Sequence, residues 1–367
     1  MKTTSFAGLC VATAGALALA IVAVGRQPSY EAPDTAGELL FPSLVNDVNK
    51  LKTVVVRSKD GTYSLDYNNQ VWGFRERDNY PIDDKKVAEL VLRMARMAKL
   101  EAKTKLEDRY ERLDLNAPDA KDSRAKQVTL LDKDGKTLAG LIVGKRKFTL
   151  GSKEGGTYIR IPGDAQTWLA TGELNPGDKA RDWLKRDIAD IKDKDIKRVT
   201  IKHPDGERVV VAKEKAEDTT FKIQGIPAGK VPSSDFVADE FGRVLAIFLL
   251  DDVDKATDVK MPADKTITAE FEGFEGFKVF VEYAELDGKH WIKVRGEATA
   301  PAASAEVKPA EGAVAPPAPA TDWVKAMVDL TQRGQGWVFE VPAYEVSALK
   351  KRMADITKKP DPPAPNT

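Results

Sequence analysis

Four Asp-Gly pairs constrain the fold more than any other feature of this sequence, because each is flanked by alternating apolar residues. They are Asp60-Gly61, Asp134-Gly135, Asp205-Gly206 and Asp287-Gly288. Asp-Gly accommodates the positive φ angles of a tight hairpin turn, and alternation of apolar and polar residues is typical of half-buried strands. The pairs therefore predict antiparallel hairpins at these places and a chain rich in β-structure.

The spacing of these pairs predicts an internal duplication. The first two lie 74 residues apart and the last two lie 82 residues apart. The segment Lys52–Gly61 aligns with Lys197–Gly206 at an offset of 145 residues, with four of ten positions identical. Repetition of this kind is the signature of a repeated structural unit. The two halves, about 44–170 and 188–343, are therefore expected to superpose.

Each half also predicts one buried helix after its first hairpin. Pro81, Asp83 and Asp84 supply the start signals of the first helix, and Ser234 or Asp235 caps the second. The apolar stripe of the first helix comprises Val87, Leu90, Val91, Met94 and Met97. The stripe of the second comprises Val237, Phe241, Val244, Leu245 and Phe248. Apolar residues at this spacing indicate one helix face packed against a sheet.

The remaining elements follow from alternation and from β-branched or aromatic residues. Strands of the first half are expected at residues 63–67, 71–74, 127–131, 138–143 and 157–161. Those of the second half are expected at 209–211, 221–223, 266–271, 277–283, 290–295 and 337–341, with helices at 323–330 and 344–357. The predicted fold class is α+β: two tandem copies of a β-β-α-β-β-β unit, with antiparallel sheets each covered by a helix.

The expected domain boundaries follow from these elements and from linker-like segments. They are a transmembrane anchor or signal segment at 1–26, a linker at 27–43, a first α+β repeat at 44–170, a connector at 171–187, a second repeat at 188–357 and a disordered tail at 358–367. Within the second repeat, residues 299–320 hold nine Ala and five Pro in 22 positions, which is the composition of an extended loop.

The apolar segment at residues 6–24 indicates the cellular compartment of the rest of the chain. It has no charged side chain over nineteen positions, and a helix of this length spans about 28 Å, close to the hydrocarbon thickness of a bilayer. Two interpretations are open: an uncleaved transmembrane helix, or a cleaved secretory signal with Ala18-Leu19-Ala20 as its A-x-A site. We favour the anchor, because cleavage at that site would leave apolar residues on the mature chain. Both interpretations place the rest of the chain outside the cytoplasm.

Cys10 is the only cysteine of the chain and lies within this apolar segment. A lipoprotein signal requires a small residue before the modified cysteine, whereas Leu9 precedes Cys10. We therefore expect Cys10 to be buried in the membrane helix, and the exported part to fold without disulfide bonds.

Composition and motifs argue against an enzyme and against nucleic-acid binding. Lys plus Arg number 57, as do Asp plus Glu, so the chain lacks the basic excess of a nucleic-acid binder. His203 and His290 are far apart in sequence, and the chain has neither a G-x-S-x-G elbow nor a P-loop. The basic runs 144–147 and 350–352 are either patches for lipid or nucleic acid or solvated surface, which we favour. We expect no catalytic residues, no cofactor and no metal.

Two acidic segments are candidate cation sites. Residues 132–135 resemble part of a calcium loop but lack its closing Glu, so a hairpin turn is expected there. Asp251, Asp252 and Asp254 follow the second predicted helix, where acidic groups are unfavourable beside the negative helix end. These three either bind a cation or are solvated loop charges, and we favour the second interpretation.

Several stretches, taken in order, match a known pattern. They are Leu51–Val56 with the Asp60-Gly61 hairpin, Val71–Phe74, Asn79–Asp83, Lys103-Thr104, Tyr110–Leu115, Tyr158–Arg160, Asp182–Leu184 and Gly336–Tyr344. Together they resemble the bacterial domain-of-unknown-function family 4340, over most of residues 44–357. Each stretch alone is an ordinary strand, turn or helix start, so their order is the evidence. The loop at 299–320 departs from the family pattern as an insertion.

The resemblance implies an exported or membrane-anchored bacterial protein, of a kind whose genes accompany ABC-type transport systems linked to gliding motility. It carries over no catalytic residues. We therefore expect a single-pass protein of the bacterial inner membrane, with its folded part in the periplasm, that serves as a non-enzymatic accessory or scaffold of an ABC-type transport system. Its expected partners are transporter subunits and, through residues 6–24, the lipid bilayer. The alternative is a periplasmic binding module for a cell-envelope glycan or other envelope ligand, which exposed aromatic side chains would contact.

Overall fold

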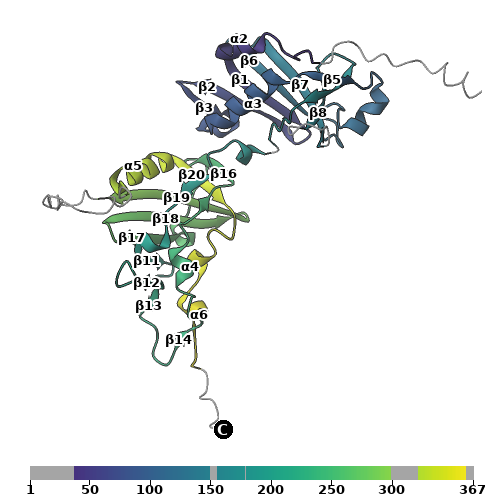
Figure 1. The fold of residues 1–367 in the computed structure, drawn as a ribbon. Coiled ribbons are helices and arrows are strands. Elements are labelled where there is room, and N and C mark those ends of the chain that lie inside the picture. The colour runs from purple at the N-terminus through teal and green to yellow at the C-terminus, as the bar shows by residue number, and fades with distance from the viewer. Residues whose placement is uncertain (1–36, 149–154, 178, 299–320, 361–367) are drawn as a thin grey trace, which may run out of the picture.

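The computed structural model describes residues 37–148, 155–177, 179–298 and 321–360. Within these residues the protein is α+β, with two large antiparallel sheets and few helices. Figure 1 shows the sheets in two separate units, one above the other, joined by a short connector. We define the first unit as residues 37–171, the connector as 172–186 and the second unit as 187–358.

The first unit is built on one antiparallel sheet. Its strands among the described residues are β1 (Leu51–Ser58), β2 (Gly61–Asn68), β3 (Val71–Phe74), β4 (Tyr80–Pro81), β5 (Lys99–Ala102), β6 (Lys126–Asp132), β7 (Thr137–Lys147), β8 (Gly156–Arg160) and β9 (Thr167–Thr171). They lie in the order β4-β3-β2-β1-β6-β7-β8-β9-β5. In β1, the alternation of buried Val54 and Val56 with the exposed Arg57 shows how the sequence pattern selects the core face.

The second unit is built on a similar sheet. Its strands among the described residues are β11 (Ile196–Lys202), β12 (Arg208–Ala212), β13 (Lys222–Gln224), β16 (Asp252–Lys255), β17 (Ile267–Gly273), β18 (Phe277–Leu286), β19 (Lys289–Ala298) and β20 (Trp337–Val341). They lie in the order β13-β12-β11-β17-β18-β19-β20-β16. Two short pairs, β10 (Asp187–Ala189) with β15 (Phe248–Leu249) and β14 (Val231–Pro232) with β21 (Thr357–Lys358), flank this sheet.

The two sheets follow the same chain order over eight successive positions of their described strands. When the strands of each sheet are numbered by their order in the chain, with the short β4 left out, the two sheets have the same spatial order. It is third, second, first, fifth, sixth, seventh, eighth and fourth. In this shared order three strands precede the helical segment and five follow it, whereas the sequence predicted a β-β-α-β-β-β unit. The sequence did not predict β5, β9 or β16. Strands β9 and β5 form one end of the first sheet, and β20 and β16 form the corresponding end of the second.

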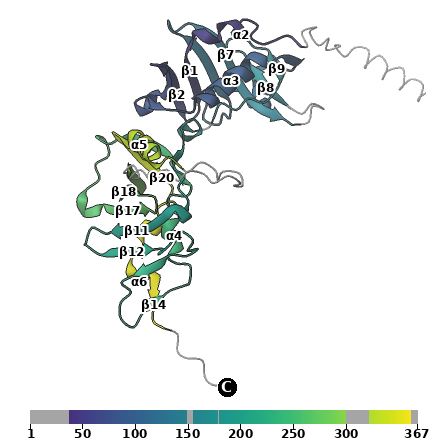
Figure 2. The same cartoon turned by 60° about the vertical axis from the view of Figure 1, so that its left-hand side comes forward.

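The first predicted helix is present as α3 (Asp84–Arg96). Asp83 caps it by accepting a hydrogen bond from the Lys85 backbone N–H at 3.1 Å. Its buried face carries the predicted residues Val87, Leu90, Val91 and Met94. The helix lies across one face of the first sheet in both Figure 1 and Figure 2.

The second predicted helix is wrong in extent. Only α4 (Asp239–Gly242) is helical, although the expected stripe from Val237 to Phe248 is buried. Two contacts explain the early end: the buried Asp239 carboxylate accepts a hydrogen bond from the Phe221 backbone N–H, and Gly242 lies directly under the Phe221 ring. Glycine also weakens a helix interior, so the stripe is buried by turns and by β15 instead.

The main helix of the second unit is α5 (Trp323–Gly334), which connects β19 to β20. The Trp323 ring stacks on Phe277 of β18, with ring centroids 3.9 Å apart. Gly296 of β19 leaves room for Met327, since a Cβ there would lie 2.7 Å from the Met327 sulfur. The second sheet is therefore covered by α5, at the expected position 323–330, while α4 in the segment before β15 contacts β11.

The predicted final helix at 344–357 is also wrong. The segment instead holds a 3₁₀ turn, η7 (Ala348–Lys350), and the one-turn helix α6 (Met353–Ile356). Arg352 is extended between them and binds Asp205 and Glu207, while the Glu207 carboxylate also accepts the Met353 backbone N–H at 2.9 Å. Side-chain contacts with the β11–β12 hairpin thus replace helical hydrogen bonds.

Each Asp-Gly pair joins two neighbouring antiparallel strands, as predicted. The spacing argument built on them is wrong, however. Asp134-Gly135 joins β6 to β7, and the strands at the same place in the second sheet, β17 and β18, are joined through residues 274–276. Asp287-Gly288 joins the following two strands, β18 and β19. The separations of 74 and 82 residues therefore compare turns at different places in the two sheets.

The described fold begins before the expected boundary. Residues 37–40 run beside β5, with the Leu40 backbone N–H bonded to the Met97 carbonyl at 2.8 Å. They lead into α2 (Leu44–Asp47). The proposed anchor at 6–24, Cys10, the loop at 299–320 and residues 361–367 of the tail lie outside the described residues. None of the helices in the part of the chain that the structure describes combines the length and apolar character needed to cross a membrane.

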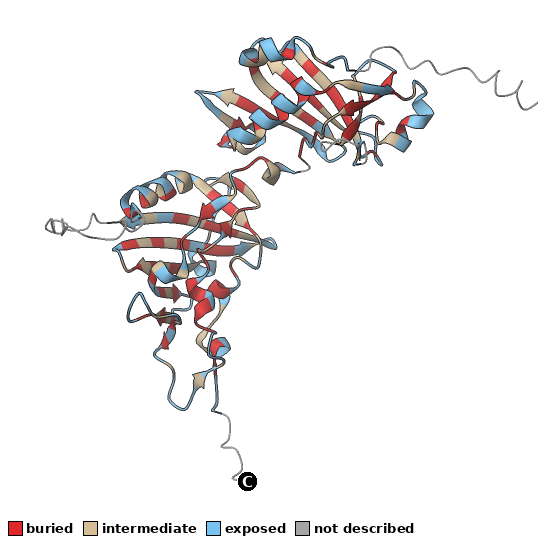
Figure 3. Ribbon diagram, viewed as in Figure 1, coloured by how far each residue is buried: buried red, intermediate tan, exposed pale blue. Residues whose placement is uncertain are grey.

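A crossover segment covers the outer face of the first sheet. It leads from β5 at the sheet end to β6 in the middle and contains η3 (Glu107–Leu113). A small separate core lies under it and comprises Tyr110, Leu115, Ala125 and Ile142. The main hydrophobic core is a single cluster that runs through both units. Figure 3 shows how buried and exposed residues alternate along the strands.

Candidate functional site at the junction of the two units

The two units meet at one end of each sheet. In the first unit, η2 (Arg75–Arg77) and β4 form the loop that follows β3. This loop lies against β16, the edge strand of the second sheet, and against its neighbour β20. The edge of a sheet presents unpaired backbone groups, and here the first unit covers it.

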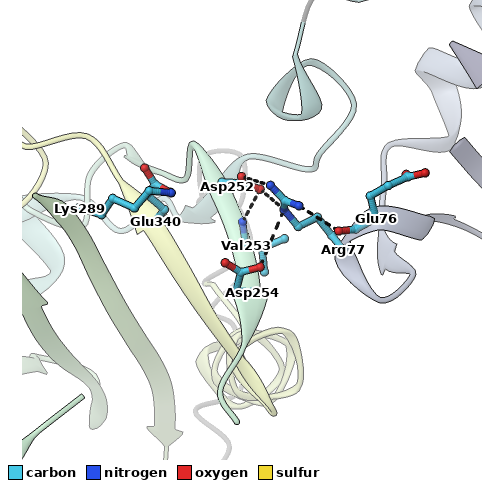
Figure 4. A network of polar contacts seen from close by, with 7 residues as sticks. All are labelled: Glu76, Arg77, Asp252, Val253, Asp254, Lys289 and Glu340. Atoms are coloured by element: carbon cyan, nitrogen blue, oxygen red, sulfur yellow. Dashed lines mark hydrogen bonds and ion pairs between the residues drawn. The ribbon is translucent and has the colours of Figure 1, made fainter. Parts of the chain in front are cut away.

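Arg77 is the polar centre of this junction (Figure 4). Its guanidinium donates two hydrogen bonds to the Asp252 carboxylate, one of them from Nε to Oδ1 at 2.7 Å. Asp254 lies on the same side, with an Arg77–Asp254 distance of 4.0 Å. The hydrogen bonds to Asp252 raise the pKa of Arg77 above its ordinary value, and burial raises the pKa of Asp254. The paired geometry is the strong, bidentate form of an Arg–carboxylate contact.

Asp251 is held by two arginines from the connector. Arg181 and Arg186 each approach one Asp251 oxygen at 3.2 Å. Arg186 also exchanges hydrogen bonds with the Leu250 backbone, donating from Nε to the carbonyl at 2.9 Å. The acidic residues expected in the sequence to be solvated, or to bind a cation, are thus ion-paired across the junction. No group of three potential metal-ligating side chains occurs among the described residues.

Aromatic packing accompanies these ion pairs. Tyr80 of β4 is almost fully buried and meets Trp337 edge to face, with ring centroids 5.0 Å apart. It also lies 6.2 Å from Phe339 of β20. Burial raises the pKa of Tyr80 to about 12. The first unit therefore contributes both a charge and a buried ring to the edge of the second sheet.

The connector is fixed to both units. Trp183 donates from Nε1 to the Tyr63 hydroxyl at 2.8 Å, and that hydroxyl donates to the Pro176 carbonyl at 2.8 Å. On the other side, Arg186 of the connector donates to the Leu250 carbonyl of the second unit at 2.9 Å. A short connector bonded at both ends restricts rotation of one unit against the other.

A pocket of about 320 Å³ opens beside these contacts. Aromatic side chains line one part of it, Tyr80 and Trp337. Polar side chains line the rest, Lys185, Asp329, Gln332 and Arg333. Apolar walls with a few polar groups are typical of small-ligand sites, and this pocket draws on both units.

The histidines lie elsewhere and apart. His203 is 2 % exposed in the β11–β12 hairpin, with Nε2 lying 3.2 Å from the Lys351 carbonyl oxygen. His290 of β19 lies 2.9 Å from the Tyr283 hydroxyl and 3.8 Å from Glu285. Each contacts its local surroundings, and neither belongs to the junction.

The remaining charged segments have structural partners. Asp132 accepts the backbone N–H groups of Asp134 and Lys136, each at 2.9 Å, and thereby closes its own hairpin. These hydrogen bonds lower the pKa of Asp132. In the basic run 144–147, Lys145 donates to the Arg112 carbonyl at 2.9 Å. In the run 350–352, Lys350 pairs with Glu285 at 2.8 Å.

Sequence reasoning named the acidic half of the junction but not its basic half. Asp251, Asp252 and Asp254 stood out as a cluster, whereas Arg77 is one of many charged residues in the chain. Tyr80 and Trp337 fell in stretches that carried the family resemblance. Nothing in their spacing indicated contact, because 257 residues of chain separate them.

Comparison with known proteins matches part of the chain to a family model. Residues 72–242 match the model of a family described as a domain of unknown function, DUF4340. No curated protein and no solved structure matches the chain. The matched range begins in β3 and ends in α4, so it crosses the connector and includes Arg77, Tyr80 and both connector arginines. The resemblance expected from the sequence is therefore confirmed over residues 72–242, where the chain matches the DUF4340 family model.

Proposed function

We propose that this protein is a non-enzymatic accessory or scaffold of an ABC-type transport system, anchored in the bacterial inner membrane by residues 6–24 with its folded part in the periplasm. The observation that carries the proposal is the junction, where Arg77 binds Asp252 and Tyr80 packs on Trp337. Those contacts hold two β-sheet units in one arrangement. The DUF4340 match supports the family on which the transport association rests.

A fixed arrangement suits a protein that works by contact. A scaffold with freely rotating units would lose orientational freedom each time it bound a partner with both, and that loss reduces affinity. The ion pairs, the aromatic contact and the bonded connector restrict this freedom before any partner binds. The arrangement presents two surfaces at a set distance, which is what a bridging protein requires.

Crosslinking in intact cells tests this proposal. The full-length chain with a C-terminal affinity tag is crosslinked, extracted from membranes with detergent and purified, and the recovered proteins are identified by mass spectrometry. Recovery of transporter subunits is expected, and fractionation should place the tagged chain in the inner membrane. Repeated recovery of the tagged chain without transporter subunits would contradict the accessory function, and a chain found only in the soluble cytosolic fraction would contradict the anchor.

The alternative function is a binding module for a cell-envelope glycan, and the pocket beside Tyr80 and Trp337 favours it. Sugar rings pack on aromatic side chains while planar polar groups bind their hydroxyls. Envelope glycan fragments would then raise the thermal unfolding temperature of the protein. The Gln332→Ala variant should lose this shift, whereas a variant at the distant and exposed Lys121 should keep it. No shift in the unaltered protein with any fragment would remove this alternative.

We also propose that the two units arose by duplication. Their sheets share a strand order over eight positions, and Lys52–Gly61 aligns with Lys197–Gly206. An experimental structure in which the eight strands of each unit superpose would support this origin. Superposition that brings α3 and α4 to opposite faces of the sheet would contradict it.

A further inference from the structure

The exposed side of α3 borders a hollow among the described residues. Its volume is about 680 Å³, and it lies between α3 and residues 171–173, where the chain leaves β9. A second hollow of about 260 Å³ continues from it toward Trp183 of the connector. The two share Glu89, Arg93 and Glu173, so they form one groove along the helix, which we call the α3 groove.

Three acidic residues line the α3 groove: Glu89 and Glu173 are paired with arginines, and the Asp182 carboxylate accepts a hydrogen bond from the Lys179 backbone N–H at 2.9 Å. Glu89 binds Arg93 at 2.7 Å, one helical turn away. Arg93 also donates to the Glu173 carbonyl at 3.1 Å. The Glu173 carboxylate in turn pairs with Arg146 of β7. The charges of Glu89 and Glu173 are therefore offset by Arg93 and Arg146.

Two cations of the groove remain without such partners. Lys85 and Arg96 line it, and the described residues provide neither side chain with a hydrogen-bond or ion-pair partner. They are eleven positions apart on α3, which places them about 16 Å apart along the helix axis. The first hollow thus has one cation near the start of α3 and one at its end, and neither has an ion-pair partner in the described chain.

An apolar surface lies between the two cations. Leu92 is 50 % exposed, and Ala88 and the buried Met97 line the same hollow. A single exposed leucine is ordinary on a protein surface. Leu92, however, lies between two cations that lack ion-pair partners. The surface of the hollow is therefore apolar in its middle and positively charged on either side.

We propose that the α3 groove binds an amphipathic helix of a partner protein, with acidic side chains about 16 Å apart and apolar side chains between them. Charge complementarity selects this occupant: its two carboxylates meet Lys85 and Arg96, and its apolar residues cover Leu92 and Ala88. The volume of the first hollow, about 680 Å³, is within the range of pockets that enclose a drug-sized ligand. This inference deepens the proposed function and rests on it in one respect: the partner protein is taken to be a component of the transport system.

A synthetic peptide tests the groove directly. The probe is a fluorescein-labelled amphipathic helix about 18 residues long, with two glutamates about eleven positions apart and leucines between them. A control peptide has lysines in place of the two glutamates. Fluorescence anisotropy with the full chain in detergent should show binding of the glutamate peptide, weakening as salt is added. The lysine peptide should bind at least about tenfold more weakly.

A matched pair of variants locates the binding. The double variant Lys85→Glu/Arg96→Glu should lose at least about tenfold in affinity for the glutamate peptide and bind the lysine peptide better. The control double variant Lys121→Glu/Lys260→Glu changes net charge equally at exposed positions outside the groove, and should bind as the unaltered protein does. Circular dichroism of both variants confirms that they fold. Equal binding of both peptides, or equal loss in both variants, would overturn the proposal.

Two further outcomes separate the groove from its alternatives. If vesicles of phosphatidylglycerol and phosphatidylcholine bind through Lys85 and Arg96 while the glutamate peptide does not, the occupant is a membrane surface and the proposal is wrong. In cell crosslinking, transporter subunits recovered equally with the groove variant would contradict the groove but not the accessory function. Peptide binding that follows the variants, with no subunits recovered by either chain, would support the groove and contradict the accessory function.

Discussion

The guanidinium of Arg77 and the carboxylate of Asp252 form a bidentate ion pair across 175 residues of sequence. Arg77 is 29 % exposed and Asp252 is 21 % exposed, so the pair is partly shielded from water. Asp252 belongs to the edge strand of one sheet and Arg77 to a loop beside the other. The pair therefore couples the orientation of the two units to the fold of each.

Removing one member of this pair should destabilise the protein measurably. Arg77→Ala leaves Asp252 partly buried beside Asp254, and we expect a loss of about 1–2 kcal/mol in the free energy of unfolding. Asp252→Ala should cost a similar amount. The double variant should cost less than the sum, since the interaction can be lost only once. Urea unfolding of the four proteins gives the coupling free energy, and small-angle X-ray scattering should show a larger radius of gyration.

An exposed ion pair of the first unit provides the control for this cycle. Lys50 binds Asp47 at 2.7 Å, but the Lys50 side chain is 65 % exposed. Lys50→Ala should change the free energy of unfolding by less than about 0.5 kcal/mol and leave the radius of gyration unchanged. A coupling near zero for Arg77 and Asp252, equal to that of the control pair, would show that the junction does not depend on their contact.

The Tyr80 ring should matter more to stability than its hydroxyl. Tyr80→Ala removes a buried ring from between the units and should cost about 3 kcal/mol. Tyr80→Phe keeps the ring against Trp337 and should cost about 0.5 kcal/mol or less. Trp fluorescence during urea unfolding measures both changes. Equal losses in the two variants would contradict a role for ring packing.

The raised pKa of Tyr80 adds a check at alkaline pH. Burial raises it from 10.0 to about 12, so the folded state prefers the neutral phenol. The stability that this preference contributes is complete below pH 10 and is lost as the pH rises toward 12. The unaltered protein should therefore lose more stability over this interval than Tyr80→Phe does.

Local patterns predicted most strands, because alternation and turn chemistry act over a few residues. Asp-Gly turns, the strand at 277–283 and the capped helix at 84–96 all depend on neighbours in sequence. The errors arose where contacts between residues far apart in the sequence determine the local structure. Phe221 against Gly242 limits α4, and contacts of Arg352 with the β11–β12 hairpin replace the expected final helix.

The junction could be predicted only in part for the same reason. Three acidic residues within four positions are visible in the sequence, and their repulsion indicates that something must compensate them. The compensating arginines come from a loop and a connector far away in the chain. Strands β9 and β16, short and without clear alternation, also escaped prediction, although β16 carries Asp252 and Asp254.

The packing of the crossover segment on β7 predicts a contrast between two glycines of one strand. A Cβ on Gly144 would lie 2.2 Å from the Leu113 carbonyl oxygen, whereas the nearest atom to a Cβ on Gly140 is at 3.6 Å, in Pro162. Gly144→Ala should therefore destabilise the protein by about 1–3 kcal/mol, because the backbone of the crossover must move. Gly140→Ala should be within about 0.5 kcal/mol of the unaltered protein. Thermal unfolding measures the stability of the two variants. Equal stabilities would show that the crossover segment does not pack closely on Gly144.

The contact between Arg352 and the β11–β12 hairpin should weaken in acid. The Met353 backbone N–H and Arg352 lower the pKa of Glu207, and the Glu207 backbone N–H and Arg352 lower that of Asp205. A lowered pKa in the folded state contributes stability that is present above the unfolded pKa, near 4, and is lost as the pH falls through the folded value. Glu207→Gln still accepts the Met353 N–H but carries no charge, so it should be less stable than the unaltered protein at pH 6. Urea unfolding between pH 6 and pH 3 should show this difference shrinking below about pH 4, whereas a constant difference would mean that the Glu207 charge does not hold the C-terminal segment.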